Sequence, residues 1–194
     1  GALESTGGKN TFIGFKAGAA LLTVSGNVVV GDSAMSACDT GIGNVVIGQN
    51  AMNAAAADVN YSVVVGNAAC LSPSSAAAGT VAVGANAFAS LTTGTNGVAV
   101  GLEAGMKIAT GNNNTCIGNV AGKKLGSTSA DNNVFMGYGA GAGGDDTFSA
   151  NSANNNVGIG NLALGATADF TADGAAFTAA NNVAVGVNAL KVAT

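Results

Sequence analysis

Two glycine-containing motifs have spacings that are associated with phosphate binding. Gly139, Gly141 and Gly144 satisfy the Gly-x-Gly-x-x-Gly pattern of dinucleotide-binding loops, but they do not open a helix after a Rossmann-type strand. The segment Gly118–Lys123 contains Gly-x-x-x-Gly-Lys, which is one residue shorter than a P-loop and lacks the Ser or Thr that binds magnesium. We therefore interpret both motifs as turns, with the lysine at the surface, and expect no cofactor.

Carboxylates are the other groups that could bind a metal ion or transfer protons. Asp145 and Asp146 are adjacent, and Asp169 and Asp173 lie close together in a second acidic stretch. Calcium-binding β-rolls place an aspartate in every short repeat, whereas these residues do not recur with a period, and short acidic loops are usually solvated turns. The sequence contains no histidine, which is the usual base in nucleophilic catalysis. We expect no metal site and no enzymatic activity.

Composition excludes two further classes of partner. The net charge is −4 and the six basic residues are all lysine, which argues against binding to a nucleic-acid backbone. Hydrophobic residues make up 48% of the chain, but Gly, Asn and Ser interrupt every apolar run well before the ~18 residues that would span a bilayer. Cys38, Cys70 and Cys116 occupy unrelated positions, so we expect buried free thiols rather than a disulfide or metal framework.

The element that must carry any function is a repeat in which a short apolar run ends in glycine, with alanine three residues later. Successive glycines are 17 to 19 residues apart over the first eight repeats, and the last two gaps are 23 and 26 residues. This period is too short for a helical hairpin, so each repeat predicts one coil of an all-β parallel solenoid. We expect a single domain over residues 1–194, with repeats from about 10 to 190. The glycines are Gly14, Gly31, Gly48, Gly66, Gly84, Gly101, Gly118, Gly137, Gly160 and Gly186.

The apolar run has two faces, numbered here backward from the glycine. Positions −3 and −1 are almost always β-branched and share one face of a strand, so we expect them to form the inner wall of the coil. Position −2 is also apolar, and a strand that is apolar on both faces is covered on both. One coil has one interior, so an apolar position −2 predicts symmetric self-association about the long axis; that the assembly is a homotrimer is implied by the family resemblance described below. The trimer-interface candidates are Phe12, Val29, Val46, Val64, Ala82, Ala99, Cys116, Phe135 and Ala184.

Two positions predict the corners of each coil. Position −4 is Asn in seven repeats, and Asn tolerates left-handed backbone angles and bonds neighbouring backbone groups. The glycine fits a second corner with a positive φ or a close backbone approach, and the alanine at +3 leaves little space between layers. Ten coils at a spacing of ~4.8 Å predict a rod of roughly 45–50 Å.

The two long gaps predict loop insertions at about 142–154 and 165–180. Insertions in solenoids emerge as loops and often carry binding, so these are candidate contacts for a host-surface glycan or protein. The alternative is that their phenylalanines pack against a neighbouring coil or protomer. The candidate receptor-contact residues are Asp145, Asp146, Phe148, Asp169, Phe170, Asp173 and Phe177.

The unit Asn-x-Val-x-Val/Ile-Gly-x-x-Ala resembles the repeat of the YadA-like head domain of trimeric autotransporter adhesins. The closest stretches are Asn182–Gly186, Gly79–Gly84 and Asn96–Gly101, and the resemblance covers nearly the whole chain. It implies a trimeric, left-handed parallel β-roll and supplies no catalytic residue. The period is longer here than in that family, and the Thr-Gly connectors at Leu91–Gly94 and Ala109–Gly111 look more like the repeat arrays of phage tail-fibre and virion-appendage proteins.

These patterns together predict a non-enzymatic fibre segment on a virion, acting as a trimeric rigid spacer of a phage tail fibre with a role in host attachment. The alternative is the head or stalk of a bacterial trimeric autotransporter adhesin at the cell surface. An ice-binding solenoid would need an outward ladder of Thr, whereas position −3 is Thr only at Thr11 and Thr115. The pattern starts and stops within a repeat, so we expect a segment of a longer fibre, with flanking fibre modules covering its open β-edges.

Overall fold

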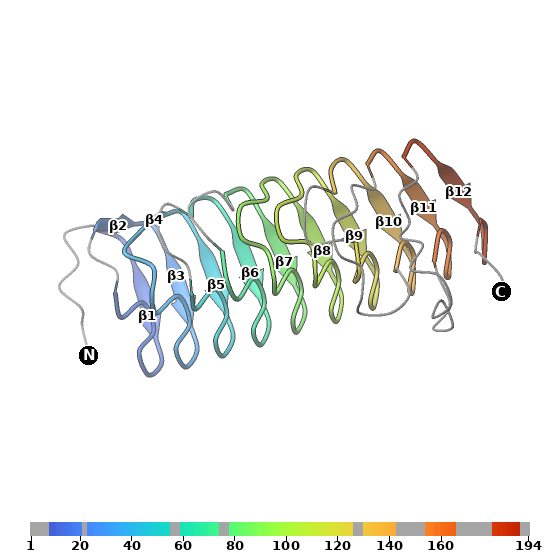
Figure 1. Cartoon of the computed structure of the whole chain (residues 1–194). Helices are drawn as coiled ribbons and strands as arrows, with labels where there is room; N and C mark the ends of the chain where they lie inside the picture. The colour runs from blue at the N-terminus through green and yellow to red at the C-terminus, as the bar shows by residue number, and fades with distance from the viewer. Residues whose placement is uncertain are drawn as a thin grey trace.

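The computed structural model describes residues 8–20, 23–54, 59–73, 78–125, 130–142, 154–165 and 180–190. All regular secondary structure in these ranges is β, as the repeat predicts, and they contain no helix. The strands run parallel and stack side by side as a β-solenoid, with β1 and β12 at opposite ends of the rod (Figure 1). The predicted parallel solenoid is therefore confirmed.

Within the described residues, ten strands form one parallel sheet in chain order, and two more form a short second sheet. Each strand of the large sheet is the apolar run at positions −3 to −1, and like positions pair with like. The register holds across both predicted insertions, because β10 pairs with β11 and β11 with β12 in the same way. The large sheet contains β1 (Thr11–Ile13), β3 (Val28–Val30), β5 (Val45–Ile47), β6 (Val63–Val65), β7 (Val81–Val83), β8 (Val98–Val100), β9 (Thr115–Ile117), β10 (Val134–Met136), β11 (Val157–Ile159) and β12 (Val183–Val185), and the small sheet pairs β2 (Thr23–Ser25) with β4 (Thr40–Ile42).

The two faces of the large sheet are the reverse of those predicted from the sequence. Residues at position −2 point into the solenoid, where Val46 and Phe135 are 0% exposed, whereas residues at −3 and −1 point outward. The prediction that positions −3 and −1 form the inner wall is therefore wrong. The trimer-interface role of position −2 is wrong for the same reason, because a side chain buried in its own chain has no surface to offer a second chain. The affected residues are Val29, Val46, Val64, Ala82, Ala99, Cys116, Phe135 and Ala184, all buried, and Phe12, which is half-buried against the same core.

The glycine column fixes the distance between neighbouring repeats. A Cβ added to Gly101 would lie 2.5 Å from the carbonyl oxygen of Gly118, and Gly101 has a φ of 135°. Both predicted reasons for glycine at this corner, a positive φ and a close backbone approach, are confirmed. Gly186 has nearly the same φ, 129°, but an added Cβ there would meet only the side chain of Ala189, at 3.9 Å.

Asparagine at position −4 forms a hydrogen-bonded ladder inside the solenoid, buried except at Asn10 and Asn182, which are half-buried. The Oδ1 atom of Asn133 accepts hydrogen bonds from the backbone N–H and the Nδ2 of Asn156, at 3.0 and 3.1 Å. The Oδ1 atom of Asn156 does the same for Asn182, at 3.0 Å in both bonds. The predicted bonding to neighbouring backbone is confirmed, but the left-handed corner lies one residue earlier, as at Asn132, whose φ is 58°. This corner position is occupied by Lys9, Gly26, Gly43, Tyr61, Gly79, Asn96, Asn113, Asn132, Asn155 and Asn181.

The ladder is interrupted at Gly97, which has no side chain to continue it. The Oγ of Ser62 still accepts a hydrogen bond from the N–H of Thr80, at 3.2 Å. Among the described residues, however, the buried Oγ1 of Thr80 has no hydrogen-bond partner. The ring of Phe88 fills the space that an asparagine would occupy, because a Cβ added to Gly97 would lie 2.9 Å from that ring.

The loop after each glycine supplies a second column of core residues. The alanine at +3 lies between two residues with left-handed backbone angles, and the residue at +4 points inward, as Met35 and Met52 do. In two of the repeats with glycine at +4 a phenylalanine takes the space: Phe88 packs onto Gly105, and Phe135 packs onto Gly141, whereas the sulfur of Cys116 lies against Gly122. The core therefore matches large residues to small ones between repeats, as close packing requires.

We predict that Gly101→Ala and Gly186→Ala differ sharply in their effect on stability. Both substitutions put a Cβ at a φ that L-residues rarely adopt, which costs about 2 kcal/mol. Only Gly101→Ala also drives the Cβ into the backbone of the next repeat, so its total cost should reach about 4 kcal/mol or more. Chemical denaturation of the two variants measures the difference, and equal losses would contradict the proposed spacing role of the glycine column.

We also predict that Phe88 and Gly97 are energetically coupled. Gly97→Asn alone should destabilise the chain, because the Phe88 ring occupies the site. The double variant Phe88→Met with Gly97→Asn should recover stability, since Met35 and the ladder residue Asn44 show the same pairing in an earlier repeat, where both are buried. A double-mutant cycle by chemical denaturation should give a favourable coupling of about 1 kcal/mol or more, and additive effects would refute the packing argument.

Candidate functional site

The candidate site is the outer face of the ten-stranded sheet, defined here as the twenty side chains at positions −3 and −1. Eighteen of them are Val, Ile or Met and the other two are Thr, so the face carries no charge. These side chains are half-buried or exposed, with Val28 at 37% and Ile47, Val63 and Met136 at 38%. The strands line up along the rod (Figure 1), so these side chains form one continuous uncharged surface that is apolar except at Thr11 and Thr115.

The strand geometry explains why this face points outward. Positions −4, −2 and 0 share one side of the strand, because side chains alternate. The Asn ladder requires its side of the strand to face the interior, because the amides of Asn27 and Asn44 are buried and bond from repeat to repeat. Positions −3 and −1 are then directed to the outside, whatever their hydrophobicity.

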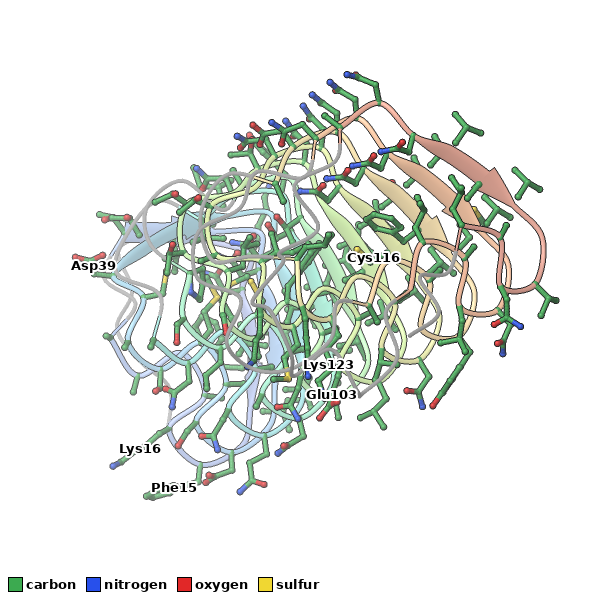
Figure 2. All side chains as sticks on the ribbon, turned by 45° about the vertical axis from the view of Figure 1, so that its right-hand side comes forward. Phe15, Lys16, Asp39, Glu103, Cys116 and Lys123 are labelled. Carbon is green, nitrogen blue, oxygen red and sulfur yellow. The ribbon has the colours of Figure 1, made fainter. Side chains whose placement is uncertain are left out.

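The outer face is wider than the strands in several repeats. The residue after the glycine is large, apolar and exposed at Phe15, Leu102, Tyr138 and Val187. At the opposite margin, the corner asparagines are exposed and bond one another from repeat to repeat. Asn113 donates to Asn132, Asn132 to Asn155 and Asn155 to Asn181, at 3.1, 3.3 and 3.2 Å. From Asn96 to Asn181 this margin of the apolar face is therefore lined by amide groups (Figure 2), whereas the first five repeats have lysine, glycine or tyrosine there.

The sequence contained a signal for the correct assignment of the faces. Position −2 varies in size from Gly158 to Phe135, and these two residues are neighbours in the register of β10 and β11. A Cβ added to Gly158 would lie 3.0 Å from the Phe135 ring. Such compensation between neighbours is typical of a closed interior, whereas the outward columns have a nearly uniform size.

The other predicted sites fall into two groups. The candidate receptor-contact residues lie outside the described residues, as does Gly144 of the Gly-x-Gly-x-x-Gly motif; these candidates are Asp145, Asp146, Phe148, Asp169, Phe170, Asp173 and Phe177. Gly139 and Gly141 have positive φ values in the turn after β10, and no helix begins there. In the Gly118–Lys123 segment, the Nζ of Lys123 lies 2.6 Å from a carboxylate oxygen of Glu103, as Figure 2 shows at the loop edge of the rod.

The three cysteines are buried, as predicted, and none of them forms a disulfide. Burial raises the pKa of both the Cys70 and Cys116 thiols from 9.0 to about 12, because the interior disfavours the charged thiolate. Cys116 lies inside the stack (Figure 2), and the Sγ of Cys38 lies 2.9 Å from the carbonyl oxygen of Thr40. These thiols are therefore packing groups. Across the described ranges, His, Cys, Asp and Glu side chains form no cluster of three that could hold a metal ion.

Comparison with known proteins finds no matching family model, no matching curated protein and no matching solved structure. The resemblance to trimeric adhesin heads and phage fibre repeats therefore stays a prediction. In the described part of the chain, no helix has the length and apolar character needed to cross a membrane.

We predict that the native chain does not react with a thiol reagent at pH 8. The raised pKa of Cys70 and Cys116 leaves almost no thiolate at that pH, and burial blocks access to all three sulfur atoms. Titration with a chromogenic disulfide should detect no thiol in the folded chain and three in denaturant. As a control, the exposed Asn67→Cys should react at once. Rapid reaction of a native cysteine would contradict the buried positions.

Proposed function

We propose that this chain is a non-enzymatic structural segment of a fibre, in which three copies associate along their outer faces to form a rigid spacer of a phage tail fibre or virion appendage. The observation that carries the proposal is the continuous uncharged outer face of the ten-stranded sheet. In the described part of the chain no other element covers this face, and we infer that the covering group comes from another chain.

The size of the outer face supports burial against another chain. Three residues across and ten strands along give a projected area on the order of 450 Å², about 10 Å by 45 Å. Soluble monomers rarely expose continuous apolar patches of more than a few hundred Å², and larger ones usually mark interaction surfaces. The accessible area exceeds the projected area, and residues such as Leu102 and Tyr138 extend it further.

A second and third copy of the same chain are the partners that fit this surface best. An identical rod has the same length, the same ~4.8 Å repeat and an equally apolar face, so two faces match along their full length. An unrelated globular partner would match this periodic surface over a few strands only. The number three, the left-handed coiling and the count of ten complete coils rest on the resemblance and on the ten sequence repeats.

The contacts between repeats support a spacer role. Neighbouring repeats are joined by backbone hydrogen bonds on the strand, at the corner and in the loop, such as Val98 N–H to Asn114 C=O at 2.7 Å and Gly118 N–H to Val100 C=O at 2.8 Å. Solenoids with such nearest-neighbour contacts form extended rods. Attachment to a host-surface glycan or protein is a further proposed role, assigned to the two insertions.

The head or stalk of a bacterial trimeric autotransporter adhesin is the second candidate, favoured by the Asn-x-Val-x-Val-Gly unit of the β12 repeat. Both candidates share the fold and the assembly. The full gene and its neighbours distinguish them: a secretion signal and a C-terminal membrane anchor indicate an adhesin, whereas adjacent virion genes indicate a phage fibre.

We predict that the purified chain contains three copies per particle, measured by multi-angle light scattering. The double variant Val83→Glu with Val100→Glu should be monomeric, because it places like charges in the middle of the buried face. Thr93→Glu, at an exposed position outside the outer face, is the matched control and should remain trimeric. A stable, soluble wild-type monomer would refute the proposed assembly.

A further inference from the structure

The outer face contains two polar side chains, and one of them lies far from either end of the sheet. Thr115 is half-buried on β9, the seventh strand of the sheet, between Val98 on β8 and Val134 on β10 in the same column. Thr11 occupies the same column on β1, at the end of the sheet, where it is exposed. Within the described residues, the hydroxyl of Thr115 makes no hydrogen bond. The residues at the same position on the neighbouring strands, Val98 and Val134, have no polar side-chain group.

Apolar contacts alone specify the alignment of such rods weakly. Each strand offers nearly the same pair of β-branched side chains, so sliding one chain by one strand exchanges valine for valine over most of the face. Uniform repeats of this kind are prone to register slippage. In coiled coils, a single polar residue in an apolar seam selects one register, because its polar group is left without a partner in the others.

We propose that Thr115 sets the register of the self-association, so that the three chains align in parallel with strand β9 beside strand β9. This inference rests on the proposed function. In the aligned assembly, the three Thr115 hydroxyls meet and can hydrogen-bond one another. After a slip of one strand, each hydroxyl faces Val98 or Val134 and loses its contact with water without gaining a partner.

The position of Thr115 also selects the direction of the chains. β9 is seventh of the ten strands, so a fully overlapped antiparallel pair would place it against the fourth strand, β6, and its Val63. Thr11 cannot replace Thr115 in a slipped assembly, because bringing the two together requires a shift of six strands and leaves most of the outer face uncovered.

Disulfide trapping between outer-face cysteines tests the proposal. Chains with Ile117→Cys should cross-link to one another when β9 lies beside β9. A second experiment mixes Val83→Cys chains with tagged Ile117→Cys chains. In the aligned assembly these two cysteines are ~10 Å apart along the rod, which is too far for a disulfide, so a cross-link between them requires a slip of two strands. The native cysteines are buried and contribute no background.

We expect the mixed cross-link to be rare with Thr115 and to increase on the order of tenfold in Thr115→Val, because the hydroxyl penalty against slipping is removed. Thr115→Ser, which keeps the hydroxyl, should return it to the low level. If Thr115→Val leaves the mixed cross-link unchanged while the chains remain trimeric, the register role is wrong and the assembly stands. If no pair cross-links and the chain is monomeric, the proposed function itself fails.

Discussion

The structure depends on the close approach of the backbones in the glycine column. Because the Gly101 backbone lies against that of Gly118, no side chain fits between them, and the same arrangement recurs along the rod. This contact sets the spacing at which the strand hydrogen bonds, the Asn ladder and the alanine loops can all form together. Which side of each strand faces inward is fixed by the buried Asn ladder, and this sends the valines at positions −3 and −1 outward.

The interior shows how a chain with few aromatic residues fills a core of stacked repeats. Most repeats place small or medium residues in each column, and two phenylalanines are accommodated by glycines nearby. Phe88 occupies the space above Gly97 and Gly105, and Phe135 occupies that beside Gly141. The Phe88 ring thus packs where an asparagine side chain would otherwise continue the ladder at position 97. The hydrogen bond lost in this way is that of the buried Oγ1 of Thr80, which has no partner among the described residues.

The sequence was sufficient to predict the solenoid, its strand positions and the role of glycine, because these follow from spacing and from the lack of a Cβ. It was misread at the faces, because Val28 and Val29 are equally hydrophobic and hydrophobicity cannot say which of two adjacent residues is inside. The direction is set by Asn27, whose buried amide bonds Asn44 inside the solenoid and so turns its side of the strand inward. An apolar outward face was expected and is present, but it consists of positions −3 and −1 and not of position −2.

The direction of the hydrogen bonds has a mechanical consequence. The strands lie across the rod, so a pull along its axis acts along the bonds that join one repeat to the next. The repeats then bear the load in series, and the rod is only as strong as its weakest junction. Between β7 and β9 the ladder at position −4 is missing, although Thr95 bonds Asn112 across the β8–β9 junction and Lys123 pairs with Glu103 there. Lateral contact with other rods would share the load in parallel, so association along the outer face would reinforce the fibre at every junction.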